Sequence, residues 1–208
     1  ACGLRSVALV TDMGQPLGEY VGNALEVMEC LEILKGGGPA DLAYLCQELS
    51  AHCLVLGEVA ASLDEGRALF REVISSGKAL GKFREIVANQ GGDPAVVEDR
   101  RVLPQARFQA PVGSPATGFV SSMNTEEIGR AMCVLGAGRE TIASEIDPAV
   151  GMRLHKKIGD WVVEGKPLCT LFYNSEERCR QARKTLLECF NLTQVPPVRP
   201  ALIKKVLS

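Results

Sequence analysis

The chain has 208 residues, which is enough for one large domain or two small ones. Hydrophobic residues make up 46% of it and charged residues 23%, as in an ordinary globular protein. The formal net charge of −2 provides no basic surface, which argues against nucleic acid and anionic membranes as partners. No apolar run approaches the roughly 20 residues of a membrane-spanning helix, and no signal-peptide pattern is present. We therefore expect a cytoplasmic protein with no membrane partner.

The segment from Thr11 to Val27, TDMGQPLGEYVGNALEV, is the most informative part of the chain. It follows the apolar run 7–10, contains Gly18 and Gly22, and leads into a helical pattern. A strand, a glycine-bearing loop and a helix start in this order are typical of the ligand-binding end of a parallel α/β sheet. Because the sequence opens without Met and close to this apolar run, we expect that it begins inside a domain.

Four helices are predicted in the first half, each from a start or stop signal. The first covers 23–35 with Asn23 as its N-cap, and the second has Pro39 as its first residue. Ser62 and Glu65 form a capping box before the third, which ends at Gly77, and the fourth covers 78–89. On the second helix, one apolar stripe follows the helical period and is predicted to face the core: Leu42, Leu45, Cys46, Leu49, Cys53 and Leu56.

The second half of the sequence is predicted to contain short strands and two helices. A polar linker or crossover is predicted over 91–107, a helix capped by Thr125 that ends near Gly136, and a final amphipathic helix from Ser175 to about Phe190. A last apolar segment covers 201–207. Strands are predicted at 108–112, 118–123, 150–155, 161–163 and 168–173. The last three are joined by turns at Gly159-Asp160 and Glu164-Gly165.

The eight cysteines form no recognisable metal or disulfide pattern. No Cys-x-x-Cys pair occurs, and His52 and His155 do not complete a zinc spacing. Cys46 and Cys53 fall on the apolar stripe of the second helix, where small buried thiols are common. We expect reduced, structural cysteines in a reducing compartment.

Five segments, in this order, resemble the C-terminal half of the pyrimidine-nucleoside phosphorylases, a family that includes thymidine phosphorylase. They are TDMGQPLGEYVGNALEV, LKGGGPADLAYLCQEL, SGKALGKFREIVANQGGDPAVVED, LGAGRETIASEID and VGMRLHKKIGDWVVEGKPL. The resemblance covers the whole chain. The stretch His155 to Asp160, HKKIGD, resembles the broad-specificity pyrimidine-nucleoside type more than the strict thymidine type.

The resemblance implies an α/β fold class with two domains. Residues 1–98 would be the C-terminal part of a mixed-sheet α/β phosphorylase lobe, and residues 108–208 the α+β C-terminal domain. Residues 150–173 also resemble half of a biotinyl or lipoyl carrier barrel, which predicts a barrel-sandwich-like hairpin there. A carrier needs a lysine at the tip of a hairpin, whereas Lys156 and Lys157 precede the turn, so a carrier role is disfavoured.

The family resemblance implies phosphorolysis of uridine- or thymidine-type nucleosides to free base and (deoxy)ribose 1-phosphate. In the family, the phosphate and base are held by an upstream Lys-x-Ser loop with paired glycines and by an upstream Arg, Ser and Lys set. This chain has no such loop, since the run from Lys35 to Gly38 lacks the serine and indicates a helix end. We assign no catalytic residue to the chain and expect it to be inactive alone, as part of a homodimeric full-length enzyme.

One implied site does fall within the chain. Members of the family resemble one another in carrying a potassium ion beside the phosphate loop, and the match gives Leu17 and Tyr20 as backbone-carbonyl ligands and Glu29 as a carboxylate ligand. Oxygen ligands suit such a hard cation. On spacing alone, Glu26, Glu29 and Glu32 could instead form a solvated stripe of the helix.

Two other functions are weighed against the phosphorylase. A noncatalytic binding or interaction module with a biotinyl/lipoyl-like barrel could be built from the same segments. A phosphoribosyltransferase is disfavoured, because its activated sugar-diphosphate site would also need the missing loop. Uracil or thymine preference, and ribose or deoxyribose preference, are left open by the sequence.

Overall fold

The structure is a computed structural model that describes residues 3, 5–139, 141–142 and 144–207. The chain divides into two compact units, each made of separate segments. The first unit consists of Ala1–Asp12, Cys30–Val102 and Ala201–Ser208, and the second of Met13–Glu29 and Leu103–Pro200. Helix α1 (Asn23–Leu34) begins in the second unit and ends in the first. No helix in the described ranges is long and apolar enough to cross a membrane.

The first unit is mainly helical, as the start and stop signals predicted. The side chain of Ser62 caps the third of these helices by accepting a hydrogen bond from the Glu65 N–H at 3.2 Å. The Glu65 carboxylate in turn accepts from the Ala61 N–H at 2.7 Å. The helical elements are α2 (Ala40–Leu56), α3 (Leu63–Ser75), α4 (Lys78–Asn89) and the short 3-10 turns η1 (Pro94–Val97) and η2 (Arg100–Val102).

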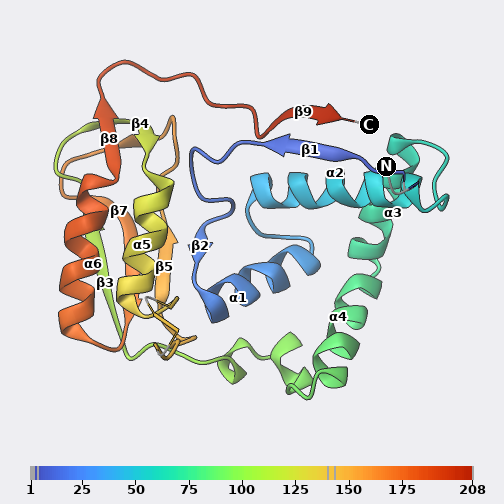
Figure 1. The fold of residues 1–208 in the computed structure, drawn as a ribbon, viewed down its shortest axis with the longest axis horizontal. Helices are drawn as coiled ribbons and strands as arrows, with labels where there is room; N and C mark the ends of the chain where they lie inside the picture. The colour runs from blue at the N-terminus through green and yellow to red at the C-terminus, as the bar shows by residue number, and fades with distance from the viewer. Residues whose placement is uncertain (1–2, 4, 140, 143, 208) are drawn as a thin grey trace. The chain divides into compact units, whose positions relative to one another are not determined.

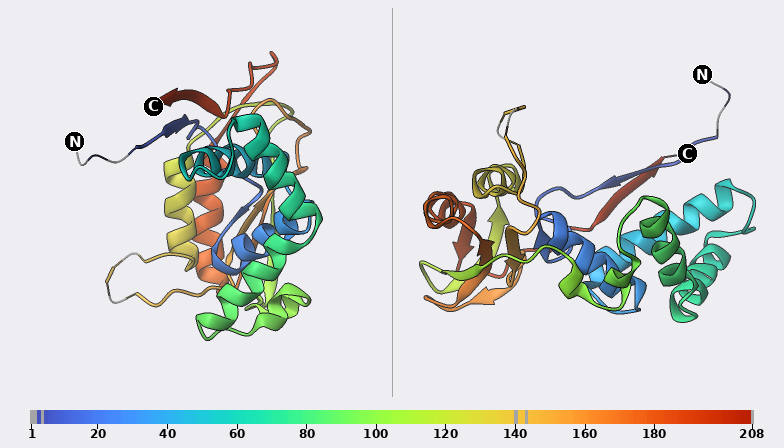
Figure 2. Two further views of the ribbon diagram at one scale, coloured as in Figure 1. Left: turned by 90° about the vertical axis from the view of Figure 1, so that its right-hand side faces the viewer. Right: turned by 90° about the horizontal axis from the view of Figure 1, so that it is seen from below.

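The pairing of strand β1 corrects the prediction of a parallel sheet. Strand β1 (Ala8–Thr11) was expected in a parallel sheet, but it pairs antiparallel with β9 (Ile203–Leu207) in a two-stranded ribbon (Figures 1 and 2). The Asp12 N–H donates to the Leu202 carbonyl at 2.8 Å, and the Asp12 carboxylate pairs with Lys204 at 2.7 Å. The apolar run that predicted a central strand therefore lies in a narrow ribbon among the described residues.

The second unit contains two antiparallel sheets. One has the order β2-β5-β7-β3, and the other has the order β6-β4-β8. Helix α5 (Thr125–Leu135) and helix α6 (Glu176–Glu188) lie side by side, as both views show (Figures 1 and 2). The strands are β2 (Tyr20–Val21), β3 (Phe108–Gly113), β4 (Gly118–Met123), β5 (Gly151–Leu154), β6 (Trp161–Val162), β7 (Pro167–Tyr173) and β8 (Phe190–Thr193).

The hydrophobic core belongs to the second unit. It is formed by the inward faces of both sheets and by one face of each helix, and it includes Val112, Val120, Met152, Leu171 and Leu186. In β5 the buried Met152 and Leu154 flank the exposed Arg153, and in β7 the buried Leu171 and Tyr173 flank a half-buried residue, as period-2 patterning predicts. The core includes residues of both β5 and β7, and β5 is the strand against which β2 pairs.

The predicted barrel-sandwich-like hairpin is wrong. Strands β6 and β7 are joined by the Glu164-Gly165 turn, but they belong to different sheets, since β6 pairs with β4 and β7 with β5 and β3. The described strands form no closed barrel. Helix starts are also shifted slightly, because Asn124 rather than Thr125 caps α5. The expected mixture of helices and strands is confirmed, but all strand pairs in the described ranges are antiparallel, so the predicted mixed sheet of an α/β lobe is not seen there.

Candidate functional site

The loop before α1 is tied to the segment that follows β5. The Lys157 ammonium donates to the Pro16 carbonyl at 2.7 Å, and the Ile158 N–H donates to the Gln15 side-chain oxygen at 2.9 Å. The Leu154 N–H donates to the Glu19 carbonyl at 2.7 Å. Two of the segments singled out in the sequence, far apart along the chain, therefore meet in one place. Lys157 is half-buried and held by this hydrogen bond, whereas the lysine of a carrier domain must be exposed and free to swing.

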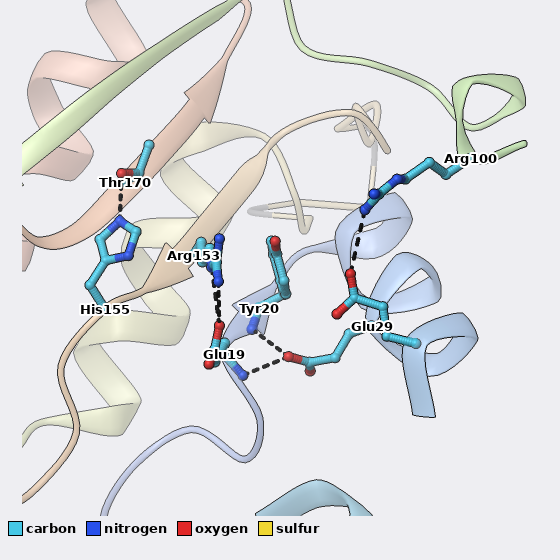
Figure 3. Close-up of polar contacts among 8 residues, drawn as sticks. Glu19, Tyr20, Glu29, Arg100, Arg153, His155 and Thr170 are labelled. Carbon is cyan, nitrogen blue, oxygen red and sulfur yellow. Dashed lines mark hydrogen bonds and ion pairs between the residues drawn. The ribbon is translucent and has the colours of Figure 1, made fainter. Parts of the chain in front are cut away.

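The carboxylate of Glu29 lies inside this loop. Glu29 is only 3% exposed, although Glu26, one turn earlier on the same helix, is exposed. Its Oε1 accepts hydrogen bonds from the Glu19 N–H at 2.7 Å and the Tyr20 N–H at 3.3 Å (Figure 3). A buried carboxylate is costly unless such donors compensate it. The solvated-stripe alternative for Glu29 is therefore wrong.

Gly18 makes room for the carboxylate. Its φ of +69° lies in the left-handed region, which a residue with a Cβ adopts only at a cost. A Cβ built at this position would lie 2.8 Å from the Glu29 Cδ and closer still to Oε2. The glycine is thus required twice, for the turn and for the approach of the carboxylate.

The three predicted cation ligands lie around this turn. Tyr20 is on the edge strand β2 and faces Arg153, while the neighbouring Glu19 carbonyl bonds to Leu154. In an antiparallel pair, the N–H and C=O of alternate residues point to opposite sides, so the Tyr20 carbonyl points to the outer edge, on the side of the Glu29 carboxylate. Leu17 is 36% exposed and directly precedes Gly18. Leu17 and Tyr20 therefore lie on either side of Gly18 in the chain, and the Glu29 carboxylate reaches this turn from α1, with carbonyl and carboxylate oxygens as the available chemistry.

A row of exposed polar side chains on the same sheet was missed from the sequence. Arg153 pairs with the Glu19 carboxylate at 2.9 Å and lies over the Tyr20 ring, 5.4 Å from its centroid. His155 Nε2 is 2.8 Å from the Thr170 hydroxyl (Figure 3). Partial burial and the nearby Arg153 charge lower the pKa of His155 below its ordinary value. The period-2 alternation over 151–155 could have placed Arg153 and His155 on one face.

The other glutamates of α1 have separate roles. Glu26 is exposed, and its carboxylate accepts from the Gly22 N–H at 3.0 Å, so it caps the helix start. Glu32 is half-buried and pairs with Arg100 at 3.4 Å. Asn23, predicted as the N-cap, is instead the first helical residue and donates to the Ala137 carbonyl at 2.8 Å. Only Glu29 of the three is turned into the loop.

The cysteines give no metal centre in the described part of the chain, which contains no cluster of three or more His, Cys, Asp or Glu side chains suited to a metal. Six described cysteines are free thiols, namely Cys46, Cys53, Cys133, Cys169, Cys179 and Cys189, and Cys2 lies outside the described residues. The prediction that Cys53 is buried is wrong, because it is exposed. Burial raises the pKa of Cys169 to about 12 and that of Cys189 to about 11, which keeps both as thiols.

Comparison with known proteins identifies the class. Residues 119–193, which contain the paired helices and most of the core, match the family described as the pyrimidine nucleoside phosphorylase C-terminal domain. The chain thus carries the C-terminal module of a nucleoside phosphorylase.

Relatives extend the match to the whole chain. The pyrimidine-nucleoside phosphorylase of Bacillus subtilis (strain 168) is 49% identical over 174 residues, covering 84% of this chain and 40% of the relative. Those of Geobacillus stearothermophilus and Staphylococcus aureus (strain USA300) are 40% and 41% identical over 206 residues, covering 99% of this chain and 47% of each relative. The chain therefore spans less than half the length of these relatives. It belongs to the pyrimidine-nucleoside phosphorylases as a C-terminal portion of one.

Proposed function

We propose that this chain acts as the C-terminal portion of a pentosyltransferase that catalyses the reversible phosphorolysis of uridine- and thymidine-type nucleosides. Phosphate attacks the anomeric carbon, the glycosidic bond breaks, and the products are the free base and ribose or deoxyribose 1-phosphate. The observation that supports this most is similarity over 99% of the chain to enzymes named pyrimidine-nucleoside phosphorylase. Because nucleoside and phosphate are soluble substrates, we place the reaction in the cytoplasm as part of the same proposal.

The residues of this chain support the reaction rather than perform it. No Lys-x-Ser loop with paired glycines is present in the sequence, so the groups that grip phosphate and base would come from the portion of the relatives that this chain does not span. We assign residues 1–98 to the α/β lobe and expect the complete enzyme to be a homodimer. A uridine-plus-phosphate assay tests this division of labour: the isolated 208 residues should release no uracil, and turnover by them would overturn it.

We further propose that the turn around Gly18 holds part of a potassium shell. The Leu17 and Tyr20 carbonyls and the Glu29 carboxylate would be its ligands in this chain. The burial of Glu29 supports this, because a carboxylate out of water is stabilised by a nearby cation as well as by N–H donors. A bound cation would lower the negative potential of the carboxylate next to a phosphate substrate.

The cation can be tested on the chain itself by thermal unfolding in potassium chloride and in tetramethylammonium chloride at equal ionic strength. Binding to the folded state alone adds about 2.7 kcal/mol of stability at a concentration 100 times Kd. Glu29→Gln keeps the side-chain oxygen but removes the charge, so the potassium-dependent part should disappear in this variant. Glu26→Gln is the matched control on the same helix and should retain it. Equal behaviour of Glu29→Gln and the unmodified chain would contradict the assignment.

A further inference from the structure

The loop that carries the first predicted cation ligand has little regular structure of its own. Residues 12–19, all of them described, contain no helix or strand, and two of them, Gly14 and Gly18, are glycines, which have the greatest backbone freedom. Among the described residues, none donates a hydrogen bond to the Leu17 carbonyl. The direction of that carbonyl therefore depends on what fixes the peptide groups on either side of Leu17.

Two different contacts fix these neighbouring peptide groups. On one side, Gly18 has its left-handed φ of +69° and closely approaches the Glu29 carboxylate. On the other side, the Pro16 carbonyl accepts a hydrogen bond of 2.7 Å from the Lys157 ammonium, across 141 positions of the chain. A hydrogen bond from a charged donor is stronger than one between neutral groups. Leu17 thus lies between a local turn and a strong long-range contact.

The segment 157–160, which presents Lys157, is anchored in the core of the second unit. Ile158 is 7% exposed and belongs to the core cluster. The Val120 N–H donates to the Asp160 carbonyl at 3.0 Å, and the Asp160 carboxylate accepts from the Lys157 N–H at 2.9 Å. These contacts hold the segment in place without help from the loop, so Lys157 can act as a fixed support for it.

The charge of Lys157 acts in the opposite direction to its hydrogen bond. Two positive charges repel each other, so an ammonium near a cation site weakens binding of the cation by its charge alone. Lys156 separates the two effects, because it carries the same charge and is likewise half-buried. Within the part of the chain that the structure describes, it forms no hydrogen bond or ion pair. A comparison of the two lysines therefore isolates the hydrogen bond.

We propose that Lys157 is a positioning residue for the cation. Its ammonium holds the Pro16 peptide group so that the next carbonyl, that of Leu17, is already oriented for the ion, and this outweighs the repulsion between the two charges. A group that is oriented in advance binds more tightly, because less freedom is lost on binding. Lys157 is no ligand itself, since an ammonium has no acceptor atom. The inference rests on the potassium shell proposed above.

The test is a potassium chloride titration followed by thermal unfolding of the 208-residue chain and three variants, with tetramethylammonium chloride keeping the ionic strength constant. Lys157→Met keeps most of the apolar stem and removes the donor. It should raise the apparent Kd for potassium about fivefold or more, the effect expected from one lost hydrogen bond. Lys156→Met is the matched control and should not raise the Kd. Lys157→Arg keeps both charge and donors and should stay within about twofold of the unmodified chain.

Hydrogen exchange in the absence of potassium gives a second measurement that does not depend on the ion. The Glu19 and Tyr20 N–H groups donate to Glu29, and they should exchange faster in Lys157→Met than in Lys156→Met, because the turn has lost its support. The core strands β5 and β7 should exchange at the same rate in both variants, which verifies that the second unit stays folded.

The outcomes distinguish this inference from the cation site on which it rests. If potassium stabilises the unmodified chain and Lys157→Met binds it equally well or more tightly, the positioning role is wrong and the cation site stands. Equal losses in Lys157→Met and Lys156→Met would attribute the effect to charge and would also overturn the role. So would a Lys157→Arg variant as weak as Lys157→Met, or unchanged exchange at the turn. If potassium does not stabilise the unmodified chain, the cation site itself fails, and the positioning role fails with it.

Discussion

Replacing Gly18 by Ala should destabilise the second unit more than any ordinary turn glycine would. The backbone of the new alanine must keep the left-handed φ of Gly18, which costs about 1–2 kcal/mol for a residue with a Cβ. It must also displace the Glu29 carboxylate, because the Cβ would lie 2.8 Å from Cδ. Losing hydrogen bonds to a buried charged group adds about 1.5–3 kcal/mol. We therefore expect a total of about 2.5–5 kcal/mol from these two sources.

Gly165→Ala separates the two contributions. Gly165 has a similar φ of +78°, lies in the same unit, and has no neighbour within 4 Å of an added Cβ. This variant should lose only the conformational share of about 1–2 kcal/mol. Urea unfolding followed by Trp161 fluorescence reports on the unit that holds both glycines.

A double variant completes the experiment. In a Glu29→Ala background, Gly18→Ala should cost no more than Gly165→Ala does, because the carboxylate is gone. If Gly18→Ala and Gly165→Ala are equally destabilising in the unmodified chain, the account of Gly18 as a seat for the carboxylate is refuted.

Two further predictions concern titratable groups. The pKa of His155 is lower in the folded chain, so between the folded and unfolded pKa values the unfolded chain binds more protons. Stability should therefore fall as the pH drops below about 6.5, the ordinary histidine pKa, and NMR titration should give a midpoint under that value. Thr170→Val tests the hydroxyl contact, and an unshifted midpoint in the unmodified chain would contradict the prediction. Iodoacetamide at pH 8 should modify the exposed Cys53 while leaving Cys169 intact in the folded chain, because burial raises the pKa of Cys169 to about 12 and blocks access. Equal labelling of Cys53 and Cys169 by mass spectrometry would contradict this and show that the core opens.

Local signals predicted the helices and strands well. The fourth helix was placed at 78–89 and the second strand of the second half at 118–123, with the bounds that the structure gives. Both are set by neighbouring residues, since glycines end the helix and period-2 alternation marks the strand. The capping role of Ser62 was likewise predicted, because a capping box acts over three residues.

Pairing partners could not be predicted in the same way. Strands β6 and β7 are joined by a tight turn that would suit a hairpin, but core packing sends them to different sheets. The strand Tyr20–Val21 was missed because two residues carry no periodic signal and depend on β5 for their hydrogen bonds. For α2, the period correctly gave an apolar stripe, but a period says nothing about whether another segment covers it.

At the candidate site, the sequence supplied the residues but not their arrangement. Glu29 was singled out by family resemblance, whereas its spacing with Glu26 and Glu32 suggested a surface position. The structure decides between these because Gly18 and two backbone N–H groups accommodate the carboxylate. Such a contact joins the turn to a helix residue 9 and 10 positions further on, which no helical or strand period describes.

The long separation between Glu19 and Arg153 has a consequence for how the protein matures. The pair is 134 positions apart, so this contact of the Gly18 turn cannot form before β5 has been synthesised. The hydrogen bonds from the turn to Glu29 span only 9 and 10 positions and need no distant strand. A chain truncated before β5 would therefore keep the local seat of the carboxylate but lose the ion pair that joins the turn to the sheet.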